Sequence, residues 1–278
     1  MSHISRRTFF LGRVEAVKIV LVMALVLGCW LPVLGAEDFP GLANPYSPLI
    51  SQPAFHVETK LSPIFIGVSS GKVTMASTSS EWGLKEAFGM DQTFLFLDSM
   101  VRFQFGRFSL RCIYEQRDIF GETHFQHDPA APKARARLDY SGLRLGADAD
   151  LYQWGLSRIG LNFDQDLYPL IFSEANETPG GVKFQGKEVV TLGVHAVYNP
   201  IWTWYGVSGL VEFRARWPLS QTKVTDVAVS VGVKTPETVL GAMSWRVGYR
   251  STAFELTGAQ RTLDGILGGW FGELAYFF

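Results

Sequence analysis

Charged side chains are scarce in this sequence. Asp, Glu, Lys and Arg make up 18% of its 278 residues, whereas soluble domains usually contain about a quarter. The formal net charge is −1, so no surplus of positive charge indicates a nucleic-acid partner. Of the two cysteines, Cys29 lies in an N-terminal segment that we expect to be removed, which leaves Cys112 alone. The composition therefore excludes a disulfide-bonded scaffold and gives no sign of nucleic-acid binding.

Aromatic residues and glycine are abundant instead. Aromatic residues make up 14% of the chain, and there are 28 glycines. Few charges together with many aromatic residues and glycines are typical of a strand-rich protein whose surface faces lipid.

The N-terminal region has the features of an export signal. Arg6, Arg7, Arg13 and Lys18 form a basic start, and residues 19–36 carry no charge. We therefore expect residues 1–36 to be a signal peptide, although an uncleaved membrane anchor is the alternative because the apolar stretch is near the minimum length of a spanning helix. Residues 37–60 contain prolines at positions 40, 45, 48 and 53, which disfavour strand pairing. We expect them to form a periplasmic lead-in, with the main domain at residues 61–278.

In that domain, apolar and polar side chains alternate with a period of two, which is the pattern of strands with one apolar face. About ten strands are expected, and about eight or twelve remain open. Their expected positions are residues 62–75, 94–105, 108–115, 136–145, 151–163, 189–198, 207–217, 226–234, 243–256 and 267–278.

The connections between these segments alternate in length. Short turns are expected at residues 106–107, 146–150, 199–205 and 235–238. Longer connections are expected at residues 76–93, 118–135, 164–188 and 258–266, and only residues 218–223 break the trend. Short turns at one end and long loops at the other are typical of barrels in the outer membrane, whose short turns face the periplasm.

The last strand carries the most specific signal. Trp270, Leu274, Tyr276 and Phe278 share one face, and Glu273 lies on the other. This segment resembles the closing strand of bacterial outer-membrane β-barrel proteins, whose chains typically end in Phe. The resemblance implies an all-β fold, a transmembrane antiparallel up-and-down β-barrel, in the bacterial outer membrane. It also implies recognition by the barrel-assembly machinery and contact with outer-membrane lipid and lipopolysaccharide.

The polar faces of the strands collect charges of both signs that we expect to line the lumen. An unpaired charge away from water is costly, and a barrel of this size is narrow. We therefore expect these side chains to pair and plug the lumen; the alternative is a narrow, slightly anion-favouring diffusion channel, as in porins. The predicted network contains Arg102, Arg111, Glu115, Glu212, Arg214, Arg216, Asp226, Arg246 and Glu273, and Arg250 shares the same face.

Two features are expected at the outer rim. Lys133, Arg135 and Arg137 lie where a long loop returns to the wall. Because arginine binds phosphate well, one interpretation is contact with lipopolysaccharide phosphates, and the equal alternative is a plain charged rim. Residues 167–172 are mostly apolar although they lie in an outer loop. Such a segment must bury itself or bind something, and we prefer a lid folded over the lumen to contact with lipid or a hydrophobic ligand.

No catalytic arrangement is evident. An omptin-type protease would need paired Asp and Asp–His groups at the outer rim; Asp164 and Asp166 lie at a suitable height, but His195 lies deep in the wall. A lipid-modifying barrel enzyme would need Ser and His two residues apart, and His195 has no such neighbour. His124, His127 and Asp128 are spaced like metal ligands, but no regular backbone holds them. We expect a structural or surface-binding protein that is not an enzyme, without metal or cofactor.

Overall fold

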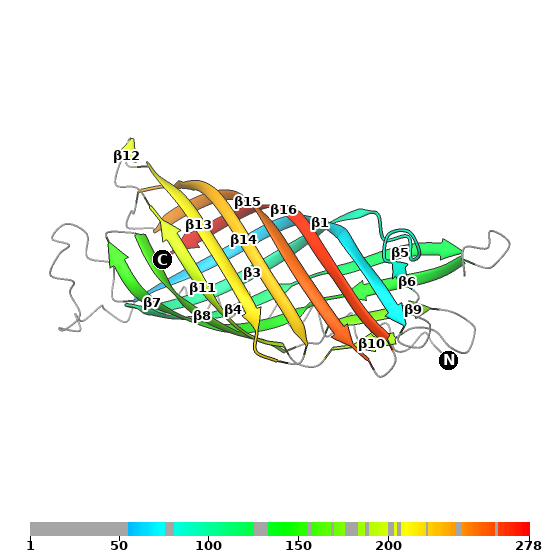
Figure 1. Ribbon diagram of the computed structural model, residues 1–278. Coiled ribbons are helices and arrows are strands. Elements are labelled where there is room, and N and C mark those ends of the chain that lie inside the picture. Colours follow the sequence, from blue (N-terminus) through cyan, green and yellow to red (C-terminus); the bar gives the residue numbers. More distant parts are fainter. Residues whose placement is uncertain are drawn as a thin grey trace, which may run out of the picture.

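The computed structural model describes residues 55–75, 81–124, 133–154, 157–167, 170–175, 183–186, 189–199, 203–204, 207–220, 222–236, 241–258 and 261–278. The described residues form a closed antiparallel β-barrel of ten strands with a small sheet at one end (Figure 1). The predicted fold class is therefore confirmed. The expected signal peptide and residues 37–54 of the expected lead-in lie outside the described residues.

Alternating apolar and polar residues produce long strands in the barrel wall. These are β1 (Phe55–Met75), β3 (Thr93–Phe105), β4 (Phe108–Glu115), β7 (Gly142–Trp154), β8 (Ser157–Asp166), β11 (Val189–Tyr198), β13 (Val207–Pro218), β14 (Lys223–Lys234), β15 (Ala242–Thr257) and β16 (Arg261–Phe277). The short strands β2 (Glu81–Gly83) and β12 (Thr203–Trp204) pair with β1 and β13.

The barrel closes by pairing β1 with β16 and β11 with β13. Following the cross-strand partners from Val68 once round the wall leads back to β1 at His56. The stagger of the sheet is thus about 12 residues, which for this strand number tilts each strand by roughly 40°.

Phe278 marks the inner end of the barrel, since its backbone N–H donates to the carbonyl of Val57 at the start of β1 (2.9 Å). The short turn at Gly106–Arg107 lies at the same end, where β3 pairs with β4 down to Phe105 and Phe108. We call the opposite end the outer end.

Several expected boundaries move. Residues 55–60 belong to β1, so the barrel begins before the predicted boundary at residue 61. Residues 146–150, expected to be a turn, lie inside β7, and the chain instead turns between Trp154 and Ser157. Residues 258–266, expected to be a long loop, mostly belong to β16. Gly146, Asp148 and Asp150 imitate turn composition, although Asp148 and Asp150 are buried in the lumen.

At the outer end, part of the wall continues as a second sheet (Figure 1). It contains β5 (Asp118–His124), β6 (Lys133–Asp139), β9 (Ile171–Ala175) and β10 (Lys183–Gln185), paired in the order β10-β9-β6-β5. These segments directly follow or precede β4, β7, β8 and β11 along the chain. We call them the outer sheet.

The outer sheet encloses the apolar core of the molecule. The core contains four side chains from the outer sheet and its flanks: Ile119, Leu138, Leu170 and Phe172. They are buried together with residues from the outer part of the barrel wall and from the β2–β3 connection. Among these partners are Ile66, Leu84, Phe88, Met90, Phe96, Phe254, Leu263 and Leu267. Burial of apolar surface here fixes the outer sheet to the barrel.

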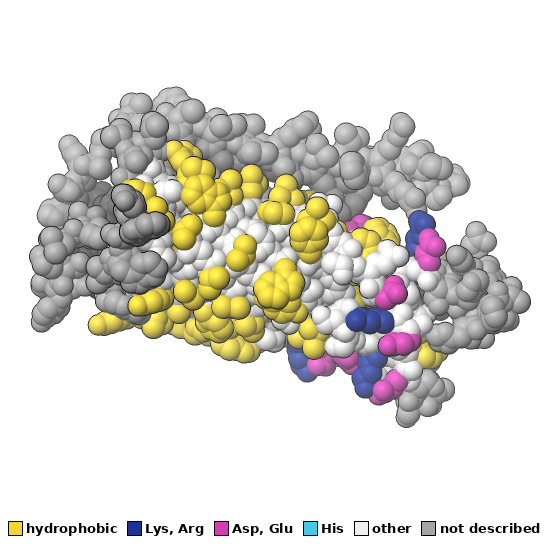
Figure 2. Space-filling model, turned by 90° about the horizontal axis from the view of Figure 1, so that it is seen from above, with side chains coloured by type: hydrophobic (Ala, Val, Ile, Leu, Met, Phe, Trp, Pro, Cys, Tyr) yellow, Lys and Arg dark blue, Asp and Glu magenta, His cyan; other side chains and the backbone are white. Residues whose placement is uncertain are grey.

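The outside of the barrel wall is apolar. Exposed large hydrophobic side chains occur on every wall strand, for example Phe65, Leu97, Leu161, Val229 and Trp270. Figure 2 shows hydrophobic side chains spread along the wall, with charged side chains gathered beyond them at the outer end. No helix within the described ranges is long and apolar enough to cross a membrane.

Candidate functional site

The barrel interior is the candidate site because it gathers the buried charges of the chain. Every lumen residue predicted from the sequence lies there and forms at least one ion pair within 4.0 Å. They come from strands all around the wall, because successive residues of a strand point alternately in and out.

A layer of paired charges lies halfway along the lumen, and we call it the central layer. Glu58 of β1 accepts a hydrogen bond from Arg102 of β3 (2.8 Å) and lies 3.2 Å from the ammonium of Lys60. Lys60 also lies 3.3 Å from Glu273 of the closing strand. Arg246 of β15 pairs with Glu273 and with Glu212 of β13. The layer therefore crosses the lumen from β1 to β13.

A second part of this layer ties β4 to β7 and β8. Nη2 of Arg111 lies 2.8 Å from Asp164 and 2.9 Å from Asp148. Gly146 is the strand neighbour of both Arg111 and Asp164. A Cβ at this position would lie 2.3 Å from Asp164 Oδ1 and 2.9 Å from Arg111 Nη2. Glycine therefore leaves the space that this ion pair occupies.

The next layer toward the outer end is equally dense. Asp226 of β14 accepts hydrogen bonds from Arg250 (2.8 and 2.9 Å), Arg216 (3.2 Å) and the hydroxyl of Thr252 (2.8 Å). Arg144 pairs with Glu115 and with Asp166. The Tyr140 hydroxyl donates to Asp166 (2.8 Å) and accepts a hydrogen bond from Arg216 (3.1 Å).

A smaller cluster lies toward the inner end. Nε2 of His195 is 2.7 Å from Asp150, and both side chains are buried. Arg158 donates to Gln104 (2.7 Å) and lies 3.7 Å from Asp150. His195 is thus held by one carboxylate in the lumen.

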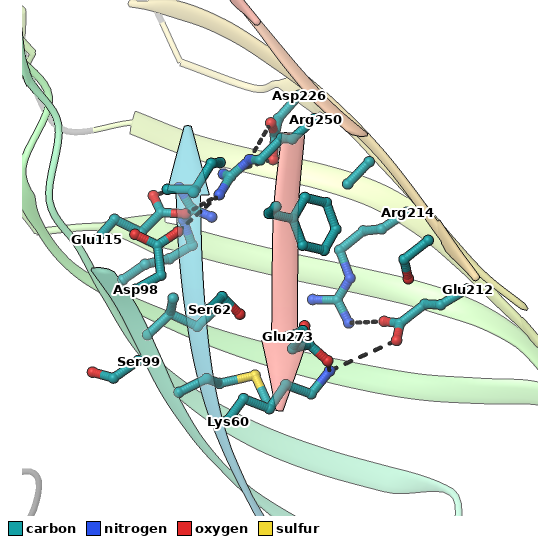
Figure 3. A pocket seen from close by; sticks show the side chains of 17 residues that line it. Lys60, Ser62, Asp98, Ser99, Glu115, Glu212, Arg214, Asp226, Arg250 and Glu273 are labelled. Atoms are coloured by element: carbon teal, nitrogen blue, oxygen red, sulfur yellow. Dashed lines mark hydrogen bonds and ion pairs between the residues drawn. The ribbon is translucent and has the colours of Figure 1, made fainter. Parts of the chain in front are cut away.

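One cavity of about 130 Å³ lies between the central and outer layers. In Figure 3, Arg250 points toward Glu115 and Asp226 at one end of this cavity, while Arg214 points toward Glu212 and Lys60 lies near Glu273 at the other. The space suffices for a few water molecules, and its charged lining is already engaged in ion pairs within the protein.

The sequence prediction missed many members of this network. Glu58 and Lys60 were assigned to the lead-in, and Asp148 and Asp150 to a turn. Asp164 and Asp166 were considered only as candidate protease residues; they pair with Arg111 and Arg144 instead. A usable signal was present, because Arg144, Gly146, Asp148 and Asp150 alternate with Leu145, Ala147 and Ala149.

The predicted rim residues fall partly within the described structure. Arg135 pairs with Glu122 (2.9 Å), and Arg137 pairs with Asp118 (2.7 Å) and Asp139 (3.0 Å). The Arg137 guanidinium also lies over the Phe120 ring (5.7 Å). The side chain of Lys133 and those of the His124, His127 and Asp128 group lie outside the described residues. Within the described ranges, no cluster of His, Cys, Asp or Glu is arranged to hold a metal ion.

The predicted segment at residues 167–172 is described at both of its ends. Leu170 and Phe172 are buried in the apolar core above the charged layers. The Phe172 ring lies 5.3 Å from that of Phe88 and 6.1 Å from that of Phe184. The predicted residues of the closing strand lie on the outside of the wall. Trp270, Leu274 and Phe278 are exposed there, and the Tyr276 ring packs edge-on against the Phe278 ring, with 4.4 Å between the ring centroids.

Comparison with known proteins gives little. No family model matches the chain, and no curated protein matches it. A structural comparison finds the outer membrane protease OmpT from Escherichia coli (10% identity, 79% of this chain and 97% of that chain, TM-score 0.38). It also finds an outer membrane channel from Pseudomonas putida F1 (8% identity, 85% and 99%, TM-score 0.35) and a Pseudomonas aeruginosa FadL homologue (9% identity, 81% and 89%, TM-score 0.32).

These scores are too low to carry a conclusion about this chain, whose fold stands on its own strand pairing. That pairing is continuous around the barrel, the outer surface of the wall is apolar, and the lumen is charged. The chain is a ten-stranded antiparallel barrel with the architecture of outer-membrane β-barrel proteins.

Proposed function

We propose that this protein is a non-conducting barrel of the bacterial outer membrane, which holds the outer sheet above the membrane as a rigid surface for binding. Lipid around the wall is its expected partner, because the exposed wall is apolar on every strand and such a surface is stable only against hydrocarbon. No catalytic step is part of the proposal.

The proposal rests on two layers that lie one above the other inside the barrel, a layer of paired charges and an apolar core. Paired charges cross the barrel from wall to wall at the level of Lys60, Glu212 and Arg246. Above them, buried apolar side chains pack between the wall and the outer sheet. An ion would have to separate buried ion pairs, at a cost of several kcal/mol, and then pass through this apolar layer.

The outer sheet provides a defined surface rather than a loose set of loops. Its strands are paired edge to edge, and its inner face is anchored by Ile119, Leu138 and Phe172, which are completely buried. Arg135 and Arg137 are bound to carboxylates, so contact with lipopolysaccharide phosphates is not needed to explain them.

Planar-bilayer recording of the refolded protein tests the proposal. A closed lumen predicts no conductance steps above background, while a large-pore porin in the same bilayers gives steps and shows that the assay works. Regular steps from the purified protein would instead support the narrow diffusion channel. Folded barrels show a heat-dependent shift in gel mobility, and this shift is measured on the same sample. It ensures that an absence of conductance steps is not due to unfolded protein.

A further inference from the structure

Arg214 differs from the other arginines of the lumen. Each of the others donates at least one hydrogen bond to an acceptor of the protein. Arg214 reaches only Glu212 at 3.7 Å and Asp148 at 4.0 Å, and it donates no hydrogen bond to the part of the chain that the structure describes. A guanidinium carries five N–H donors, and donors inside a protein are normally satisfied. Water or a ligand must therefore accept from Arg214.

The two carboxylates near Arg214 are held more closely by other arginines. Glu212 accepts a short hydrogen bond from Arg246. Asp148 lies 2.9 Å from Nη2 of Arg111. Neither carboxylate is therefore a full partner for Arg214, whose side chain reaches into the cavity from β13 (Figure 3).

The two ends of the cavity differ in their charge balance. At the end nearer the outer sheet, four arginines pair with four carboxylates, namely Arg117, Arg144, Arg216 and Arg250 with Asp98, Glu115, Asp166 and Asp226. At the end formed by the central layer, Lys60, Arg214 and Arg246 share two carboxylates, Glu212 and Glu273. Glu58, beside Lys60, is hydrogen-bonded by Arg102 (2.8 Å). A ligand with one negative charge would therefore complement the end that contains Arg214.

Between these charged ends the cavity lining is mostly apolar. Met100, Ile113, Ala228 and Phe271 contribute to it. The hydroxyls of Ser62 and Ser230 also line the cavity, and neither forms a hydrogen bond with another described residue. This lining suits a ligand with a charged end and a short hydrocarbon end better than a fully hydrated ion.

We propose that the cavity binds one short-chain carboxylate, of the size of acetate or propionate, through Arg214. The two carboxylate oxygens match the fork of guanidinium donors, and the hydrocarbon end lies against the apolar lining. A volume of about 130 Å³ holds several water-sized groups, so a long fatty acid is excluded. The ligand enters during folding or when the central layer opens briefly, and no path through the barrel is required.

Equilibrium dialysis of radiolabelled propionate tests the site. The protein is refolded in detergent micelles with propionate present, so that closure of the barrel cannot keep the ligand out. The heat-dependent gel shift shows that each variant is folded. We expect saturable binding of a single propionate per barrel. The result does not depend on conductance, so it can be read whether or not the lumen proves closed.

Two variants attack the site in different ways, so one folded variant is sufficient. Arg214→Gln removes the charged donor and should weaken binding by at least about tenfold, as the loss of a charged hydrogen-bond partner usually does. Ala228→Leu fills the cavity without removing any ion-pair partner, and it should abolish binding.

Arg158→Gln is the matched control. The Arg158 side chain is 15% exposed and that of Arg214 is 16% exposed, and each replacement removes one positive charge, but Arg158 does not line the cavity. We expect its affinity to equal that of the parent. No binding by the folded parent, unchanged binding in a folded site variant, or an equal loss in Arg158→Gln would overturn the proposal. Equal competition by chloride or by propionamide would also overturn it, because neither presents a charged carboxylate.

Discussion

At the scale of single residues, space and charge are arranged together inside the barrel. Gly146 is the clearest case, because its missing side chain leaves room for the Arg111–Asp164 pair. Both partners are about 1% exposed, so neither can turn to water if the space is filled. A buried charge that loses its partner costs several kcal/mol. Position 146 is therefore important for stability although its glycine contributes no side chain.

Replacing Gly146 therefore has a predictable cost. Gly146→Val puts methyl groups where the ion pair lies, and we expect the free energy of unfolding to fall by about 2–4 kcal/mol. Ala147→Val, next to it on the exposed face of β7, adds the same kind of bulk outside the barrel and is expected to change little. Urea unfolding of both variants in lipid vesicles measures the difference. Equal stability of the two variants would contradict the packing argument.

Above the apolar wall, a row of charges crosses β14, β15, β16 and β1. Lys223 pairs with Glu255 (3.0 Å), and Asp264 is the cross-strand neighbour of both Glu255 and Lys72. Partial burial raises the pKa of the Asp264 carboxyl; Lys72 opposes this change, while Glu81 and Glu255 add to it. The charged form of Asp264 is therefore less favourable in the folded protein than in the unfolded chain.

This direction sets the sign of a pH effect. A carboxyl whose pKa is raised on folding stabilises the fold below its unfolded pKa, about 3.9, and loses that contribution as pH rises through the folded value. We expect Asp264→Asn to be more stable than the parent at pH 7, by less than about 1 kcal/mol because the site is largely solvated. The difference should vanish near pH 3. Unfolding curves at both pH values measure it, and a variant less stable at pH 7 would contradict the assignment.

At the scale of strands, the sequence predicts those strands whose apolar and polar residues alternate without interruption. Strands β11 and β13 and the β3–β4 hairpin alternate cleanly, and their predicted ranges agree closely with the structure. Strand β7 was misread because its inward Gly146 and Asp148 make sense only beside Arg111 on β4. Likewise, β5, β6, β9 and β10 resemble loops until Ile119, Leu138 and Phe172 come together in one core.

That core makes the outer sheet a separate unit of stability. Phe172→Ala removes a fully buried ring from contact with Phe88 and Phe184, and such a change costs about 3–5 kcal/mol. We expect it to loosen the outer sheet while the barrel, held by its own ladders, stays folded. Hydrogen exchange should then accelerate in β5, β6, β9 and β10 but not in β15 and β16.

Phe120→Ala is the comparison variant. Phe120 belongs to the same sheet but is 38% exposed on its outer face. Its replacement should leave hydrogen exchange in the outer sheet almost unchanged. If both variants accelerate exchange equally, or if exchange in the barrel strands rises as well, the outer sheet is not an independent unit.

At the scale of the whole molecule, the inside and the outside of the wall follow opposite rules. The lumen holds paired charges, and the exposed wall holds Trp217, Trp245 and Trp270. Trp82 instead packs against the apolar core at the outer end. If lipid surrounds the wall, as proposed, these tryptophans should differ in their contact with acyl chains.

Single-tryptophan proteins test this arrangement. In vesicles made with brominated acyl chains, a protein that keeps only Trp245 should lose most of its fluorescence, and one that keeps only Trp82 should lose little. The quenching reports contact with bromine inside the bilayer and does not depend on any activity. Equal quenching of both proteins, or free solubility of the chain lacking residues 1–36 without detergent, would contradict a transmembrane barrel.

The outer connections are uneven around the barrel. Between β4 and β11 the chain rises into the outer sheet, whereas residues 219–222 and 258–260 link β13 to β14 and β15 to β16 almost directly. The barrel is therefore taller on the side from β4 to β11, the tall flank, than on the side from β13 to β16, the low flank. In the proposed membrane, a neighbouring protein could approach the low flank along its whole height, but on the tall flank it would meet the outer sheet. Crowded neighbours would then contact this barrel more often along its low flank than along its tall one.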